Sequence, residues 1–74
     1  MVNHNKKMLL KKLGNRIAGL RASKGLTIEK LAYENDLAKG NLSEIEKGLI
    51  DPQLSTLTRI ADGLDVNLAV LLDL

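Results

Sequence analysis

The sequence predicts an all-α fold in which five short helices form a single domain. Apolar residues recur at three- and four-residue steps along most of the chain, which is the spacing of helices with one buried face. The apolar residues are almost all aliphatic, with Tyr33 as the one aromatic side chain, and this composition favours helices packed against helices. A chain of 74 residues has room for one small hydrophobic core.

The first helix is expected over residues 8–23, behind a flexible basic arm formed by residues 1–7. The arm either reaches toward a partner or is a terminus without function. Gly25 follows a basic last turn, which is a typical helix end. Gly14 and Gly19 lie inside the helix, where each costs about 1 kcal/mol relative to alanine, and the sequence does not decide which of them allows close helix contact. The apolar stripe of this helix comprises Leu10, Leu13, Ile17 and Leu20.

Two further helices, over residues 28–34 and 39–47, are expected to be joined by a tight turn. Thr27 stands just before the first of them and is expected to cap its N-terminus through the hydroxyl group. The turn is expected at Asn35 and Asp36, because both residue types tolerate a left-handed backbone. In the second helix the apolar residues are spaced to form one buried stripe, and the other positions are small or polar.

A fourth helix is expected over residues 54–63, with Gly63 as a weak stop, and Asn67 is expected to cap a short fifth helix. The fourth helix is expected to bury Leu54, Leu57, Ile60, Ala61 and Leu64. Six of the last seven residues are apolar, which is more than one short helix buries within its own domain. We therefore expect a two-fold homodimer, although the same residues can instead complete the core of a monomer. The expected dimer interface comprises Val66, Leu68, Leu71, Leu72 and Leu74.

Residues 26–48, LTIEKLAYENDLAKGNLSEIEKG, carry most of a longer pattern that runs over roughly residues 13–72. This pattern resembles the Cro/lambda-repressor-like helix-turn-helix family, also called the XRE group. Each short motif is weak alone, but the ordered set is specific. The matching residues are Leu20, Arg21, Leu26, Thr27, Glu29, Leu31, Ala32, Leu37, Leu42, Ser43, Ile45, Glu46, Lys47, Gly48, Pro52, Leu57, Arg59, Ile60, Ala61, Leu64 and Val66.

The resemblance implies a five-helix lambda-repressor-like domain over residues 8–74, with the helix-turn-helix at about residues 28–47. Such a domain would act as a homodimeric transcriptional regulator that binds a palindromic operator in double-stranded DNA, with residues 39–47 in the major groove. It also implies an ion pair between Arg21 and Glu46. The alternative is that the two residues are unrelated surface charges. The residues expected to contact DNA are Thr27, Ile28, Lys39, Gly40, Asn41, Ser43, Glu44 and Lys47.

Three positions depart from the family pattern. Ile28 replaces the usual glutamine at the start of the second helix, Ala38 replaces a capping serine, and Asp36 replaces a turn glycine. The loss of a cap costs on the order of 1 kcal/mol. Ile28 and Ala38, with Gly40 and Glu44 in the third helix, leave open an alternative in which the protein is an interaction module with weak or lost DNA binding.

Charge and composition bound the remaining possibilities. All seven charged residues before Gly25 are basic, whereas four basic and nine acidic residues follow it. This distribution either attracts a polyanion to one face or belongs to a solvated basic helix. The absence of cysteine, the single histidine at His4 and the lack of a nucleotide-binding glycine loop predict no enzyme, metal site or cofactor, and no small-molecule ligand is evident. No apolar run suits a membrane and no signal peptide is present, so a cytoplasmic protein is expected.

Overall fold

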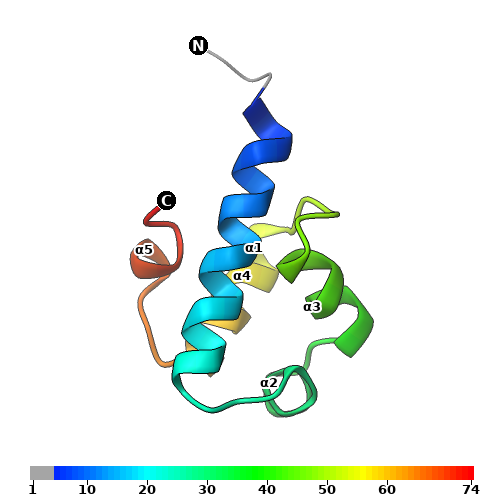
Figure 1. Ribbon diagram of the computed structural model, residues 1–74. Helices are drawn as coiled ribbons and strands as arrows, with labels where there is room; N and C mark the ends of the chain where they lie inside the picture. The colour runs from blue at the N-terminus through cyan, green and yellow to red at the C-terminus, as the bar shows by residue number, and fades with distance from the viewer. Residues whose placement is uncertain (1–4) are drawn as a thin grey trace.

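The computed structural model describes residues 5–74, which form five α-helices and no strand (Figure 1). α1 spans Lys6–Ser23, α2 Ile28–Glu34, α3 Lys39–Glu46, α4 Leu54–Gly63 and α5 Leu68–Leu71. α1 runs through the middle of the molecule, with α3 on one side and α5 on the other (Figure 1). The all-α prediction is confirmed, and α2 and α4 have the bounds expected from the sequence.

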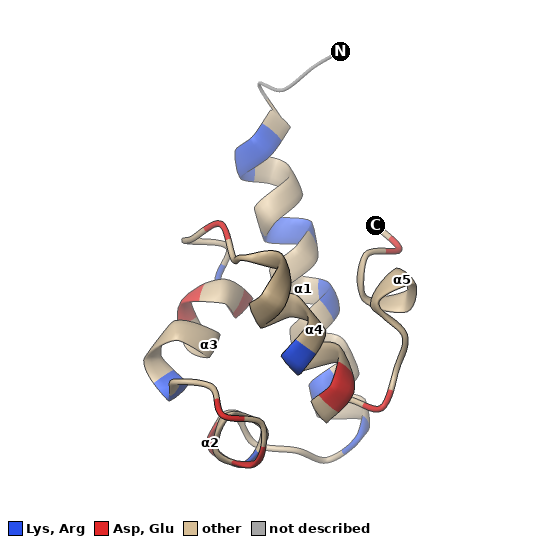
Figure 2. Ribbon diagram, turned by 180° about the vertical axis from the view of Figure 1, so that it is seen from behind, with Lys and Arg blue, Asp and Glu red and all other residues tan. Residues whose placement is uncertain are grey.

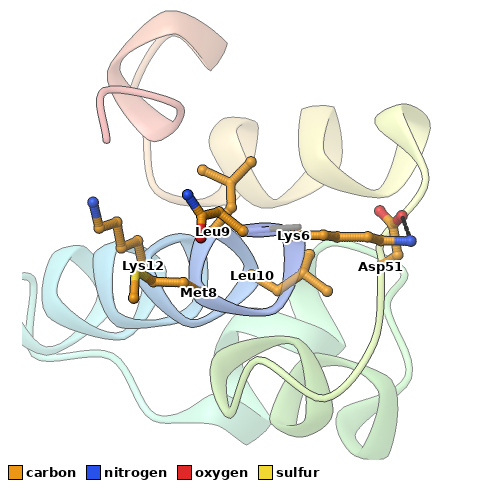
Figure 3. Close-up of a pocket in the computed structure, with 7 residues that line it drawn as sticks. Lys6, Met8, Leu9, Leu10, Lys12 and Asp51 are labelled. Atoms are coloured by element: carbon orange, nitrogen blue, oxygen red, sulfur yellow. Dashed lines mark ion pairs between the residues drawn. The ribbon is translucent and has the colours of Figure 1, made fainter. Parts of the chain in front are cut away.

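α1 begins earlier than expected, at Lys6 rather than at residue 8. Lys6 and Lys7 therefore belong to a helix and not to an arm, while the rest of the expected arm, residues 1–4, lies outside the described residues. The ammonium group of Lys6 lies 3.1 Å from the carboxylate of Asp51, which links the first turn of α1 to the loop after α3. This ion pair is solvent-exposed and lies at the edge of an open hollow beside α1 (Figure 3).

The first turns of α1 extend beyond the bundle (Figure 1). Met8 and Leu9, which line the hollow in Figure 3, are 59% and 51% exposed. The buried part of α1 starts further along, at Leu13. The basic N-terminal end of the helix is therefore attached to the fold mainly through the later turns of α1.

All five helices contribute to one hydrophobic core, and no polar or charged side chain is buried among residues 5–74. Leu54 was expected in this core, but it is 62% exposed because it is the first residue of α4 and Leu57 is the first to turn inward. The buried residues are Leu13, Ile17, Leu31, Ala32, Leu42, Ile45, Leu57, Ile60, Ala61, Leu64 and Leu71.

Two positions after each of the first four helices, the chain has a residue with a left-handed backbone. After this residue the chain closes a Schellman-type hydrogen bond, in which the next amide donates to a carbonyl in the last turn of the helix. Leu26 N donates to Arg21 O over 3.1 Å after α1, and Leu49 N donates to Glu44 O over 3.0 Å after α3. The left-handed residues are Gly25, Asp36, Gly48 and Asp65.

The turn predicted at Asp36 is thus confirmed, with φ of 56°. α4 ends at Gly63, as predicted, but the left-handed residue that follows the helix is Asp65, with φ of 57°. Gly63 also has a role in packing. A Cβ atom placed there would overlap Asn35 and would lie 2.6 Å from a methyl carbon of Leu31, so the absence of a side chain lets α4 approach α2.

Gly14 is the glycine of α1 that allows close helix contact. A Cβ atom at this position would lie 2.6 Å from the carbonyl oxygen of Ile45 and would also overlap the carbonyl group of Glu46. At Gly19 a Cβ atom would meet nothing within 4 Å. The backbone of α1 therefore rests directly on the C-terminal end of α3, and only glycine fits at the point of contact.

Gly14→Ala and Gly19→Ala are expected to change stability in opposite directions. Gly14→Ala should lower the free energy of unfolding by about 1–3 kcal/mol, because the added methyl group forces α1 and α3 apart. Gly19→Ala should raise it by up to about 1 kcal/mol, because alanine is the better helix former and the site is open. Urea unfolding followed by circular dichroism measures both values. A stabilised Gly14→Ala protein would contradict the tight contact.

Candidate nucleic-acid interface

α3 buries only a narrow apolar stripe and turns its polar face to solvent. Leu42 and Ile45 are each 1% exposed and form its contact with the core. Ser43 is half-buried, and the other residues predicted to contact DNA from this helix and its C-cap are exposed, namely Lys39, Gly40, Asn41, Glu44 and Lys47. A short helix that is held by one stripe and open on the opposite face has the shape required to enter a groove.

The two helices of the motif begin differently. The hydroxyl group of Thr27 accepts a hydrogen bond of 3.0 Å from the Lys30 amide, which confirms the predicted cap of α2. Ala38 stands at the N-cap of α3 and supplies no side-chain hydrogen bond there. The first amides of α3 are therefore not satisfied by a capping side chain.

Ile28, at the start of α2, is half-buried and packs against the core. Thr27 beside it is exposed. The isoleucine that replaces the polar residue of the family pattern thus fastens the start of α2 to the domain, while part of its surface remains accessible.

The ion pair expected between Arg21 and Glu46 is present and has two parallel hydrogen bonds. Arg21 Nε donates to one carboxylate oxygen over 2.7 Å, and Arg21 Nη2 donates to the other over 2.9 Å. Arg21 Nη1 donates to the carbonyl oxygen of Leu26 over 2.8 Å. The side chains of Arg21 and Glu46 are only 18% and 7% exposed. The hydrogen bond with Glu46 raises the pKa of the Arg21 guanidinium group above its ordinary value.

This arrangement fixes the C-terminal end of α3. Glu46, its last residue, is held by Arg21 of α1, while Gly14 of the same helix lies against the carbonyl groups of Ile45 and Glu46. The Gly48 amide donates to Ile45 O over 3.0 Å and closes the helix. The orientation of the exposed face of α3 is therefore set by contacts at one end of the helix.

A second ion pair, not predicted from the sequence, lies at the other end of α3. Lys39 Nζ is 2.8 Å from a carboxylate oxygen of Glu29 in α2. Both side chains are more than half exposed. Hydrogen bonding to Lys39, and secondarily to its own backbone amide, lowers the pKa of Glu29 below the ordinary value. Glu29 is therefore ionised at neutral pH, and its ion pair with Lys39 is lost as the pH falls through this lowered pKa.

The charged residues are distributed unevenly over the fold. Lys and Arg lie along α1 from its first turn to its end, while the acidic residues lie on the later helices and loops (Figure 2). One exposed acid of α2, Glu29, is paired with Lys39 of α3, and Glu44 lies on the exposed face of α3. The candidate interface is thus a mixed surface and not a uniformly basic one.

The residues expected to form a dimer interface differ in accessibility. Leu71 has no exposed surface and belongs to the core, so it cannot itself contact a partner, and this part of the prediction is wrong. Val66 and Leu68 are half-buried against the core. Leu72 and Leu74 are 40% and 44% exposed, and Val70, which was not in the predicted set, is 37% exposed. A helix of four residues cannot turn every apolar side chain inward.

α5 is attached to α1 by Arg16, whose Nε donates to the Val70 carbonyl oxygen over 3.0 Å. Asn67 stands at the N-cap of α5 as predicted but makes no capping hydrogen bond through its side chain. Among the residues that the structure describes, no helix is long and apolar enough to cross a membrane. Residues 5–74 also contain no group of three or more acidic, His or Cys side chains placed to hold a metal ion.

A family model described as a helix-turn-helix domain matches residues 12–74. The chain is 37% identical over 62 residues to the HTH-type transcriptional regulator SinR of Bacillus subtilis (strain 168). This match covers 82% of the chain and 56% of SinR, so the chain spans little more than half the length of that relative.

Solved structures share the arrangement of helices. The restriction-modification controller protein C.AhdI from Aeromonas hydrophila has a TM-score of 0.82 at 32% identity, over 84% of this chain and 94% of that protein. The controller protein C.Esp1396I, solved as a tetramer in complex with its natural 35 base-pair operator, has a TM-score of 0.79 at 35% identity, over 85% and 83% of the two chains.

Arg21→Met is expected to lower the free energy of unfolding by about 3 kcal/mol, because it leaves the partly buried carboxylate of Glu46 without a partner. Arg21→Met combined with Glu46→Leu should cost less than the sum of the single changes. Lys6→Ala, which removes the exposed pair with Asp51, is the control and should cost less than about 1 kcal/mol. Chemical unfolding measures all four variants. Strict additivity of the Arg21 and Glu46 changes would show that the pair is not coupled.

Proposed function

The chain belongs to the XRE-like helix-turn-helix family of transcriptional regulators, and we propose that it binds double-stranded DNA sequence-specifically, with α3 in the major groove. The observation that carries this proposal is the exposed polar face of α3, held outward by the ion pair of Arg21 and Glu46. A controller protein with the same fold was solved on its operator, which supports the assignment. In bacteria such as the source of SinR, DNA lies in the cytoplasm, and we propose that the protein acts there.

The side chains of α3 offer different contacts to the duplex. Lys39 can donate to O6 and N7 of guanine, and Glu44 can accept from the amino group of cytosine. Ser43 and Asn41 can bond to either a base or the backbone. Lys47, at the C-cap, is placed to meet a phosphate, which adds affinity without sequence choice.

The start of α2 supplies a backbone contact in this proposal. The Lys30 amide already donates to the Thr27 hydroxyl, so the amides of Ile28 and Glu29 are the first-turn donors proposed for a phosphate oxygen. Ile28 would lie beside that phosphate and contribute apolar contact rather than the hydrogen bonds of a polar residue. Both positions orient the protein on the duplex without reading its sequence.

We also propose that the protein binds its operator as a two-fold homodimer. Leu72, Leu74 and Val70 form an apolar surface at the C-terminal end, which the half-buried Val66 and Leu68 continue. Pairing two such surfaces would remove this apolar area from water. A two-fold dimer presents two copies of α3, which read half-sites about 34–36 Å apart on a palindromic operator.

The alternative function is a protein-interaction module that keeps the fold but binds DNA weakly. Two features of α3 favour it, namely the start of the helix, which has no side-chain cap, and the ion pair that Lys39 makes with Glu29. Both are expected to weaken the contacts of α3 with DNA. Salt dependence separates the two functions. DNA binding through phosphates weakens steeply as salt rises, because condensed counterions are released on binding, whereas an interaction module would show only feeble binding to every duplex.

Lys39→Ala and Glu44→Ala are expected to change which DNA sites are preferred, because both residues contact base edges in this proposal. Lys47→Ala should weaken binding to all sites about equally and reduce the salt slope by about one for each subunit. Selection of bound duplexes from a random pool, followed by titrations at several salt concentrations, measures both effects. The same change in preference for all three variants would contradict the assigned roles.

Leu72→Asp is expected to give a folded monomer, because it puts a charge into the proposed interface at an exposed position. Leu54→Asp is a matched control, since Leu54 is also an exposed leucine but lies at the start of α4. Leu71→Asp is unsuitable, because it would bury a carboxylate in the core and unfold the protein. Sedimentation velocity reports the oligomeric state. A monomeric Leu54→Asp protein beside a dimeric Leu72→Asp protein would place the interface at the start of α4 and not at the C-terminal end of the chain.

A further inference from the structure

Glu29 engages a donor that DNA would otherwise use. One of its carboxylate oxygens lies 2.8 Å from the ammonium group of Lys39. In the proposed complex, Lys39 contacts a base. The free protein thus holds its own anion against a side chain that DNA would approach.

The two residues belong to the starts of different helices. Glu29 is the second residue of α2 and Lys39 is the first of α3, and their side chains are 63% and 62% exposed. Lys39 follows Ala38, which gives the N-terminus of α3 no side-chain cap. The ion pair is therefore a direct side-chain link between the two helices at the end of α3 that is farthest from Arg21 and Gly14.

An ammonium group has three N–H donors, and Glu29 engages it from the side of α2. Lys39 can therefore keep its bond to Glu29 and still donate to acceptors of a guanine edge. A phosphate is an anion, so the Glu29 carboxylate repels a phosphate that Lys39 binds unless Lys39 moves away from Glu29, whereas a guanine edge is neutral and is not repelled in this way. The two modes of binding consequently differ in what happens to Glu29.

We propose, on the basis of the proposed function, that Glu29 is a specificity-determining positioning residue. It holds Lys39 for contact with a base and keeps it from serving as a general phosphate ligand. The carboxylate lowers affinity for every sequence by repulsion, and it lowers affinity most where Lys39 must be withdrawn from it. Its effect on binding is thus a gain in selectivity and not in strength.

The test compares Glu29→Gln with the wild type on two duplexes, the one selected by the wild type and a shuffled duplex of the same composition. Fluorescence anisotropy measures both affinities over a salt series. For Glu29→Gln, affinity for the shuffled duplex should rise roughly two- to fivefold, the range expected when an exposed ion pair no longer competes. The salt slope on that duplex should steepen by about one for each subunit, because Lys39 gains a phosphate. The ratio of selected to shuffled affinity should fall.

Glu34→Gln is the matched control, because it removes the same charge from the exposed surface of α2 without touching the Lys39 pair. It should raise both affinities alike and leave their ratio unchanged. In a Lys39→Gln background, Glu29→Gln should no longer change the ratio. In the free protein, Lys39→Gln should move the pKa of Glu29 upward toward its ordinary value, which NMR titration detects.

The outcomes separate this inference from the proposed function. If the wild type selects no duplex, the proposed function fails and this inference fails with it. If the wild type binds selectively but the ratio is unchanged in Glu29→Gln, only the role of Glu29 is overturned. The same holds if Glu34→Gln lowers the ratio as much as Glu29→Gln does, since the effect would then be one of net charge alone.

Discussion

The buried contact between α1 and the C-terminal end of α3 decides where the exposed face of α3 points. Arg21 joins three segments, because its guanidinium group binds Glu46 at the end of α3 and the Leu26 carbonyl oxygen before α2. Gly14 brings the two helix backbones together at the same place. A charged pair of this kind adds little net stability compared with apolar packing, but it permits few alternative arrangements of its partners. The orientation of the motif follows from that restriction.

The opposite end of α3 is held much less firmly. Ala38 provides no cap, and the ion pair of Glu29 and Lys39 is exposed to solvent, so it contributes little to stability. The polar contacts that hold the helix are thus concentrated at its C-terminus, whereas the residues that would read bases are concentrated toward its N-terminus.

Local features of this fold could be predicted from the sequence, whereas features that depend on two distant segments could not. The cap at Thr27 follows from one residue and its neighbours, and the partner of Arg21 followed from the family pattern. Leu54 and Leu71 were misjudged because helical spacing gives the face of a residue but not whether another helix covers it. The link between Glu29 and Lys39 spans a turn, and its geometry depends on the packing angle of two helices.

Two of the four left-handed helix ends are aspartates, Asp36 and Asp65, where Gly25 and Gly48 close the other two helices. The left-handed conformation costs an aspartate more free energy than it costs a glycine, by an amount on the order of 1 kcal/mol. Both aspartates are exposed and lie outside the core. One base change turns an aspartate codon into a glycine codon, so evolution has two simple ways to raise the stability of the fold without altering the surface of α3.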